Sequence, residues 1–117
     1  MKLYEIKDTL KATVLLGEQH MEKTTTGGGA ADLMEDVLAA AAEGAVLLTG
    51  LTTEQVLRTA LIAGVGAIVF VRGKKPDQKV LDLASSYDLP VLLTDFSLFV
   101  ACGRLYMNGL RGLDGSW

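Results

Sequence analysis

The sequence predicts an α/β fold of three layers, in which helices flank a mostly parallel β-sheet. Three short apolar runs without alternation, at residues 45–49, 67–71 and 90–94, are typical of strands buried on both faces. Segments with helical periodicity separate and follow these runs. The order strand, helix, strand, helix, strand, helix favours parallel strands joined by right-handed crossovers.

Size and composition predict one domain and argue against several classes of protein. A chain of 117 residues is long enough for one hydrophobic core. Half of its residues are apolar and 21% are charged, which argues against disorder across the body of the chain. The formal net charge of −3 argues against a nucleic-acid partner, because such proteins concentrate basic residues on one face.

Cysteine usage and hydropathy predict a cytoplasmic protein. The single cysteine, Cys102, allows no internal disulfide, which fits a reducing compartment. The N-terminal segment is charged throughout and lacks the apolar stretch of a signal peptide. No stretch reaches the roughly 18 apolar residues of a membrane span, so no membrane partner is expected.

The first elements are short. Residues 3–10 carry apolar side chains at the spacing of one helix face. Residues 13–16 then predict a brief strand, and the polar residues 19–23 predict a loop. The threonines at 24–26 favour extended backbone.

Two capping signals mark the next helices. Asp32 precedes a helix over residues 33–42, and Glu35 three positions later completes the pattern of a capping box. Thr52 and Gln55 have the same spacing ahead of the following helix. Both side chains, Asp32 and Thr52, are therefore expected to accept hydrogen bonds from helix N–H groups.

The remaining elements complete one domain. Gly64 ends the helix that begins after Thr52, as glycine often does at a helix C-terminus. Further helices are predicted over residues 77–87 and 97–108. We expect a single domain over residues 1–110, followed by a loose, glycine-rich tail over residues 111–117.

A ligand site, if there is one, is expected beyond the carboxyl ends of the parallel strands. Thr49, Arg72, Thr94 and Asp95 follow the three apolar runs directly. Free N–H groups at the helix starts there could hold an anion. Together with the glycine stretch, the candidate ligand-binding residues are Thr26, Gly27, Gly28, Gly29, Thr49, Arg72, Thr94 and Asp95.

The stretch TTTGGGAAD at residues 24–32 matches neither standard phosphate-binding loop. A P-loop requires a lysine after its last glycine, and none is present. The dinucleotide fingerprint requires a glycine where this chain has Asp32, whose charge would repel a pyrophosphate. The glycines are first expected to permit positive φ or close backbone packing. A contact with a second subunit or with a ligand stays open.

No catalytic set is visible in the sequence. His20 is the only histidine and is expected to be an exposed loop residue, so no histidine-based metal cluster is predicted. Cys102 lies on an apolar helix and is expected in the core. Asp95 follows a strand, which suits a catalytic acid, but a helix cap is the more economical interpretation. We expect no catalytic residue, no metal and no cofactor.

A longer pattern resembles a known family. The run EKTTTGG at residues 22–28, followed by an aspartate-led helix, resembles the motif of the DRTGG domain. Three further segments, at residues 73–77, 89–95 and 99–106, are similar to the family in order and spacing. The resemblance extends from Lys2 to Leu110. Glu22 and Lys23 stand where the family has Asp and Arg, and lysine lacks the bidentate contact of arginine. Gly29 stands where an aromatic residue is common.

The resemblance implies an accessory role. DRTGG domains are similar in fold to the N-terminal domain of HPr kinase/phosphorylase, and they occur beside CBS domains and in phosphotransacetylases. The resemblance therefore implies a non-catalytic regulatory or assembly module. The apolar composition and the open sheet edges further favour a homodimer. The first alternative is a sensor of a nucleotide or phosphorylated anion at the carboxyl ends of the strands, and a stand-alone enzyme ranks below it.

Overall fold

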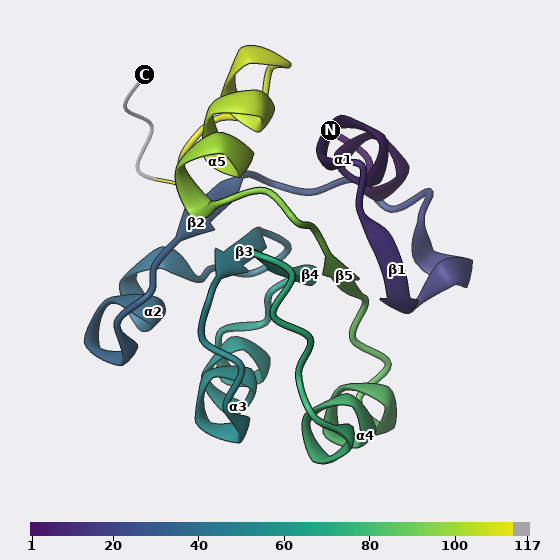
Figure 1. The fold of residues 1–117 in the computed structure, drawn as a ribbon, viewed down its shortest axis with the longest axis vertical. Coiled ribbons are helices and arrows are strands. Elements are labelled where there is room, and N and C mark those ends of the chain that lie inside the picture. Colours follow the sequence, from purple (N-terminus) through teal and green to yellow (C-terminus); the bar gives the residue numbers. More distant parts are fainter. Residues whose placement is uncertain (114–117) are drawn as a thin grey trace.

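The computed structural model describes residues 1–113 and contains a five-stranded sheet in the order β1-β5-β4-β3-β2. β1 pairs with β5 in the antiparallel direction, and the other three pairs are parallel. Helices α1 and α5 lie on one face of the sheet, and α2, α3 and α4 lie on the other (Figure 1). This arrangement confirms the predicted three-layer α/β fold with a mostly parallel sheet.

The three apolar runs of the sequence form the centre of the sheet. The strands are β1 (Thr13–Leu16), β2 (Gly28–Ala30), β3 (Val46–Thr49), β4 (Ala67–Phe70) and β5 (Val91–Leu93). Every residue of β3 and β4 is buried, because helices cover both faces of these strands. The predicted strands are therefore confirmed, with ends that differ by a residue or so.

Helices α2, α3 and α4 connect the consecutive parallel strands from β2 to β5. The α-helices are α1 (Leu3–Leu10), α2 (Met34–Ala40), α3 (Glu54–Ala63), α4 (Gln78–Ser86) and α5 (Leu98–Met107). A 3-10 turn, η1 (Glu18–His20), overlaps the start of the segment 19–23 that was predicted as a loop. Among residues 1–113, no helix is long and apolar enough to cross a membrane.

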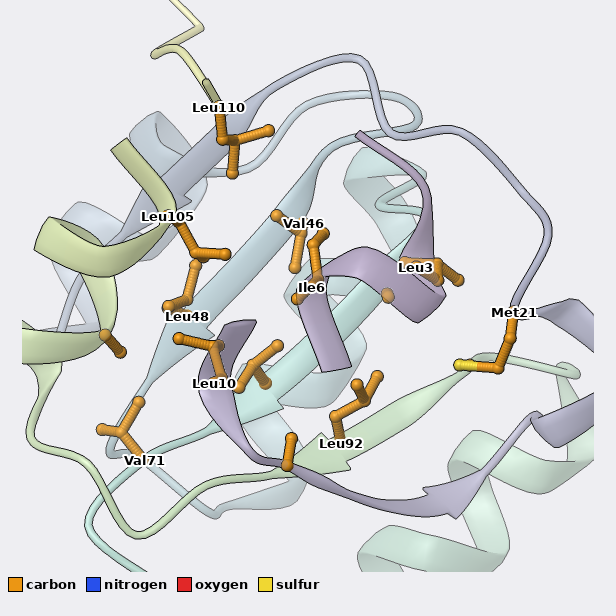
Figure 2. Close-up of a cluster of buried hydrophobic side chains, with 14 residues drawn as sticks. Leu3, Ile6, Leu10, Met21, Val46, Leu48, Val71, Leu92, Leu105 and Leu110 are labelled. Atoms are coloured by element: carbon orange, nitrogen blue, oxygen red, sulfur yellow. The ribbon is translucent and has the colours of Figure 1, made fainter. Parts of the chain in front are cut away.

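Two hydrophobic clusters lie on the two faces of the sheet. In β3, Val46 and Leu48 point to the side of α1 and α5, whereas Leu47 points to the opposite side. Figure 2 shows the first cluster, in which Leu105 of α5 lies next to Leu48 and Leu110 lies at the upper end of the cluster. The continuous apolar runs therefore supply side chains to both layers of the core.

The two capping predictions need correction. Leu33 occupies the N-cap position of α2 and makes no side-chain cap hydrogen bond, so Asp32 does not cap this helix. In α3 the cap is Thr53, whose hydroxyl accepts a hydrogen bond from the N–H of Val56 at 3.2 Å. Thr52 was the wrong residue. A helix is capped by the last residue with extended backbone before it, which here is Thr53, so the spacing between Thr52 and Gln55 does not identify the cap by itself.

Two expectations about loops also differ from the structure. His20 is not a free, exposed loop residue, because its Nε2 lies 2.7 Å from Oδ2 of Asp88, beyond the end of α4. The N–H of Gly28 donates to the carbonyl of Arg111 at 2.9 Å, and Gly112 pairs with Gly28. The first residues of the predicted loose tail thus lie along β2. The rest of that tail, residues 114–117, lies outside the described residues, and the domain boundary at residue 110 stays a prediction.

Candidate functional site

The fold brings half of the predicted site residues to one edge of the sheet. Thr49 ends β3 and pairs with Phe70, the last residue of β4. Just beyond the strands, the N–H of Val71 donates to the carbonyl of Thr49 at 3.1 Å. The N–H of Gly73 donates to the carbonyl of Thr94 at 2.9 Å. Thr49, Arg72, Thr94 and Asp95 therefore share the carboxyl edge, as predicted for residues that follow parallel strands.

Asp32 completes this edge, although the sequence did not mark it as a site residue. Its Oδ1 accepts a hydrogen bond from the N–H of Gly50 at 2.5 Å, and its Oδ2 lies 3.3 Å from Nη1 of Arg72. A carboxylate of the chain itself thus occupies the place where an anion was expected. If β2 had been recognised as a strand, Asp32 would have been predicted at the carboxyl edge, because Asp32 lies two residues after β2 as Arg72 lies two residues after β4.

The two threonines of the edge hold the chain together. The Thr94 hydroxyl donates to the carbonyl of Leu10 at 2.8 Å and accepts from the N–H of Phe96 at 3.3 Å. The Thr49 hydroxyl accepts from the N–H of Leu51 at 3.1 Å. Both threonines are buried, so their hydroxyl groups position loops rather than face solvent.

Arg72 and Asp95 are the exposed, charged residues among those predicted at this edge. The Arg72 backbone has a φ of 60°, and its N–H donates to the carbonyl of Phe96 at 2.8 Å. Asp95 does not cap α5, because Ser97 accepts the hydrogen bond from the N–H of Val100 at 3.2 Å. The cap interpretation of Asp95 is therefore wrong, and its carboxylate stands at the surface of the edge.

The remaining predicted residues lie away from this edge. Gly28 pairs with Val46, the first residue of β3, and Gly29 pairs with the residue after it. The Thr26 hydroxyl donates to the carbonyl of Glu43 at 2.9 Å, in the turn that precedes β3. Thr26, Gly27 and Gly28 therefore lie toward the amino end of the strands, so the structure does not bring the glycine stretch and Arg72 together.

Close packing explains the glycines. They form β2 and its entry instead of a strand-to-helix turn, and none of the three has a positive φ. A Cβ on Gly29 would overlap the carbonyl of Ala40, the last residue of α2. A Cβ on Gly28 would come within 2.7 Å of the Leu110 side chain. Of the two backbone roles that were predicted, close approach is confirmed and positive φ is wrong.

A cavity of about 350 Å³ lies beside β2, between the sheet and α5. It is mostly apolar, and its lining includes Gly28, Ala30, Leu48, Cys102, Tyr106 and Leu110. Cys102 is half-buried at this wall, rather than fully in the core as predicted. Burial raises the pKa of the Cys102 thiol, and the nearby Asp32 charge adds to this increase. The thiol therefore stays protonated at neutral pH and is not an activated nucleophile.

The chemistry of the edge is that of hydrogen bonding and charge pairing. Within residues 1–113, no three or more histidine, cysteine, aspartate and glutamate side chains form a group that could hold a metal ion. Among the predicted site residues at the carboxyl edge, the exposed charged groups are the Arg72 guanidinium and the Asp95 carboxylate. The guanidinium could bind an anionic group of a ligand, and the carboxylate could bind a cationic group.

Comparison with known proteins adds an independent result. A solved structure of the CBS and DRTGG domains of the regulatory region of Clostridium perfringens pyrophosphatase, complexed with the activator diadenosine tetraphosphate, is similar to this chain with a TM-score of 0.68. The identity is 21%, so the likeness concerns the fold, and the alignment covers 94% of this chain and 47% of the other. The chain thus spans about half the length of that regulatory region.

The family assignment rests on the sequence match. No curated protein matches the chain. The family model of the DRTGG domain, however, matches residues 5–106, which is most of the sequence and includes the EKTTTGG run. The chain therefore belongs to the DRTGG domain family.

Proposed function

We infer that the chain is a non-catalytic regulatory or assembly module that acts as a homodimer. The observation that carries this proposal is an apolar, exposed face on α5. Phe99 is 86% exposed and Met107 is 87% exposed. Gly103 lies midway between them, with nothing within 4 Å of the position where its Cβ would be. The spacing of four residues places all three on one face of the helix.

This face suits a second copy of the same helix. In a two-fold dimer, two antiparallel α5 helices would cross at Gly103, where the absence of a side chain permits close approach. Phe99 of each copy would then pack on Met107 of the other. The buried residues Ala101 and Leu105 anchor the opposite side of α5 to the core, so the exposed face is held rigidly.

The regulatory part of the proposal has separate support. At the carboxyl edge, where an α/β domain would place its reactive groups, Asp32 and the two threonines are engaged by the chain itself. The similar structure from C. perfringens is described as a regulatory region, and the present chain corresponds to about half of it. A module that binds a copy of itself is suited to transmit a signal between subunits.

Sedimentation equilibrium at micromolar concentration tests the dimer. We expect the wild-type chain to have twice the monomer mass of 12.4 kDa. Phe99→Glu and Met107→Glu should each give the monomer mass, because a charge would be buried without a partner. Leu38→Glu changes an exposed apolar residue of α2 and serves as the control that stays dimeric. A monomeric wild type, or dimers in both α5 variants, would rule out this interface.

A sensor of a phosphorylated ligand at the carboxyl edge is the second candidate. It is favoured by Arg72, whose side chain is 47% exposed and pairs with Asp32 through a single nitrogen. A phosphate group could replace the Asp32 carboxylate at the N–H of Gly50 and at Arg72. The ligand would then release Asp32 and the loop that leads into α2.

Thermal shift with diadenosine tetraphosphate, ATP and inorganic phosphate tests the second candidate. We expect Tm to rise with at least one of these anions in the wild type and in the control Lys75→Ala, but not in Arg72→Ala. Asp32→Asn should strengthen binding about tenfold, since it removes a competing charge but keeps an oxygen for the Gly50 N–H. Equal shifts in Arg72→Ala and Lys75→Ala, or no shift in any protein, would exclude the carboxyl edge as the site.

A further inference from the structure

We propose a binding site for a small organic anion with a planar apolar body at the opposite, amino-terminal edge of the sheet. A cavity of about 560 Å³ lies there, next to Gly66 before β4 and Pro90 before β5. It differs in position from both the carboxyl edge and the exposed face of α5. The inference therefore stands independently of the proposed dimer and of the proposed phosphate sensor.

The walls of this cavity are mainly apolar. The last turn of α3 contributes Leu61 and Ile62, and Val65 and Leu89 continue the surface toward the sheet. Ile62 is 83% exposed, so the cavity opens directly to solvent. Small-molecule sites are typically clefts of several hundred Å³ with apolar walls and a few polar groups, and this cavity matches that description.

One aromatic side chain stands at the cavity. Tyr87, at the C-terminal end of α4, lines it and is 65% exposed. Its ring offers a flat surface on which an aromatic or other planar group can stack. The Tyr87 backbone is held by a hydrogen bond from its N–H to the carbonyl of Ala84 at 3.2 Å, which fixes the point from which the side chain extends.

Two cationic side chains, from distant parts of the sequence, line the same cavity. Lys23 is the basic residue of the EKTTTGG run, and its backbone is held by hydrogen bonds with His20 at 3.0 Å and Leu3 at 2.9 Å. Arg58 of α3 contacts Glu54 only at 3.5 Å through Nη2, so other guanidinium N–H groups can turn to a ligand. Together they can bind one anionic group.

The acidic residue of the lining is held by residues outside the cavity. Asp88 lines the cavity, and its Oδ1 accepts a hydrogen bond from Nε2 of Gln19 at 3.2 Å. Its Oδ2 lies 2.7 Å from Nε2 of His20. Both oxygens are thus held by residues of η1, outside the lining, so the Asp88 carboxylate does not occupy the side-chain N–H groups of Lys23 or Arg58.

The probe that fits this description is 8-anilinonaphthalene-1-sulfonate, which joins a planar apolar body to a sulfonate and fluoresces in apolar sites. We expect the full chain to bind it, and the double variant Lys23→Ala/Arg58→Ala to bind it about tenfold more weakly, which corresponds to about 1.4 kcal/mol. The control Lys74→Ala/Lys75→Ala removes the same charge from the loop after β4 and should bind as the wild type does.

Three further measurements distinguish binding at this cavity from nonspecific binding of the dye to other apolar surfaces. Neutral N-phenyl-1-naphthylamine should bind the wild type and the Lys23/Arg58 variant equally, whereas Tyr87→Ala should weaken the binding of both dyes. Phe99→Glu should not change the affinity for the sulfonate dye, because α5 is not part of the cavity. AMP and salicylate, added as competitors, then distinguish a nucleotide from an aromatic acid as the class of ligand.

Some results would overturn the proposal. It fails if the sulfonate dye does not bind, or if the Lys23/Arg58 and Lys74/Lys75 variants bind it equally. It also fails if Phe99→Glu abolishes the fluorescence, since the dye would then lie on α5. Circular dichroism and thermal melts establish that each variant is folded, which we expect because Lys23 and Arg58 are exposed.

Discussion

At the scale of single residues, Asp32 illustrates how a side chain changes its role on folding. Its local sequence predicts a helix cap, but its carboxylate binds the N–H of Gly50 and the side chain of Arg72. Three neighbouring strand ends are thereby linked through one side chain. Gly29 shows the same dependence on distant partners, because its missing Cβ makes room for the end of α2.

Gly29→Ala is expected to destabilise the fold. The new Cβ would overlap the backbone carbonyl of Ala40, which cannot swing away as a flexible side chain can. We expect the free energy of unfolding to fall by about 2 kcal/mol, within the usual range for overpacking. Urea denaturation, at a concentration where the chain is monomeric, measures this change.

Gly103→Ala is the matched control. Its Cβ would meet nothing within 4 Å, and the residue lies inside α5. Because glycine costs about 0.5–1 kcal/mol relative to alanine in a helix, we expect this variant to be more stable by that amount. If Gly29→Ala had the same stability as the wild type, the close contact with Ala40 could not be the reason for glycine in β2.

At the scale of elements, the helix starts depend on side chains just outside each helix. Thr53, Asp77 and Ser97 cap α3, α4 and α5, each by accepting a hydrogen bond from the N–H three residues on. Helix α2 lacks such a cap, and it is the shortest of the five α-helices. Its position depends instead on the buried Val37 and on the contact with β2.

The cap of α3 can be tested with two neighbouring threonines. Thr53→Ala should lower the free energy of unfolding by about 1 kcal/mol, because the N–H of Val56 loses its acceptor. Thr52→Ala, one residue earlier, should change it by less than about 0.5 kcal/mol. Chemical denaturation of both variants decides between the two threonines, and a larger effect at Thr52 would restore the cap that its sequence spacing predicts.

At the scale of the whole molecule, both ends of the chain complete the layers. Helix α1 covers one part of the sheet, and the segment after α5 returns to the edge strand β2. Leu110 enters the core beside Leu105, as Figure 2 shows. Residues that are separated by most of the sequence, such as Gly28 and Leu110, thus pack on each other.

Leu110→Ala tests how much the packing of the segment after α5 contributes to the free energy of unfolding. We expect a loss of about 2–4 kcal/mol, as is usual when a buried leucine is truncated. Leu33→Ala removes the same atoms from an exposed position and should change stability by less than about 0.5 kcal/mol. Equal effects of the two substitutions in thermal or urea unfolding would mean that the segment after α5 does not stabilise the fold.

Local patterns in the sequence were sufficient to predict most helices and strands. The apolar runs of β3, β4 and β5 identify buried parallel strands because no alternation is needed when both faces are covered. Gly64 ends α3 in the left-handed conformation, as its position predicted. The carboxyl edge with Thr49, Arg72 and Thr94 follows from this topology alone.

Only the tertiary structure decided the rest. β2 consists of two glycines and an alanine, so it has no side-chain pattern by which a strand is recognised, and only its pairing with β3 defines it. The role of Asp32 depends on that pairing, as its partners Gly50 and Arg72 come from other strands. Likewise, Lys23, Arg58 and Tyr87 are far apart in the sequence and meet at one cavity because crossovers align the amino ends of the strands. Periodicity reports which face a residue occupies within its own element, whereas a site depends on which elements become neighbours, and long-range packing decides that.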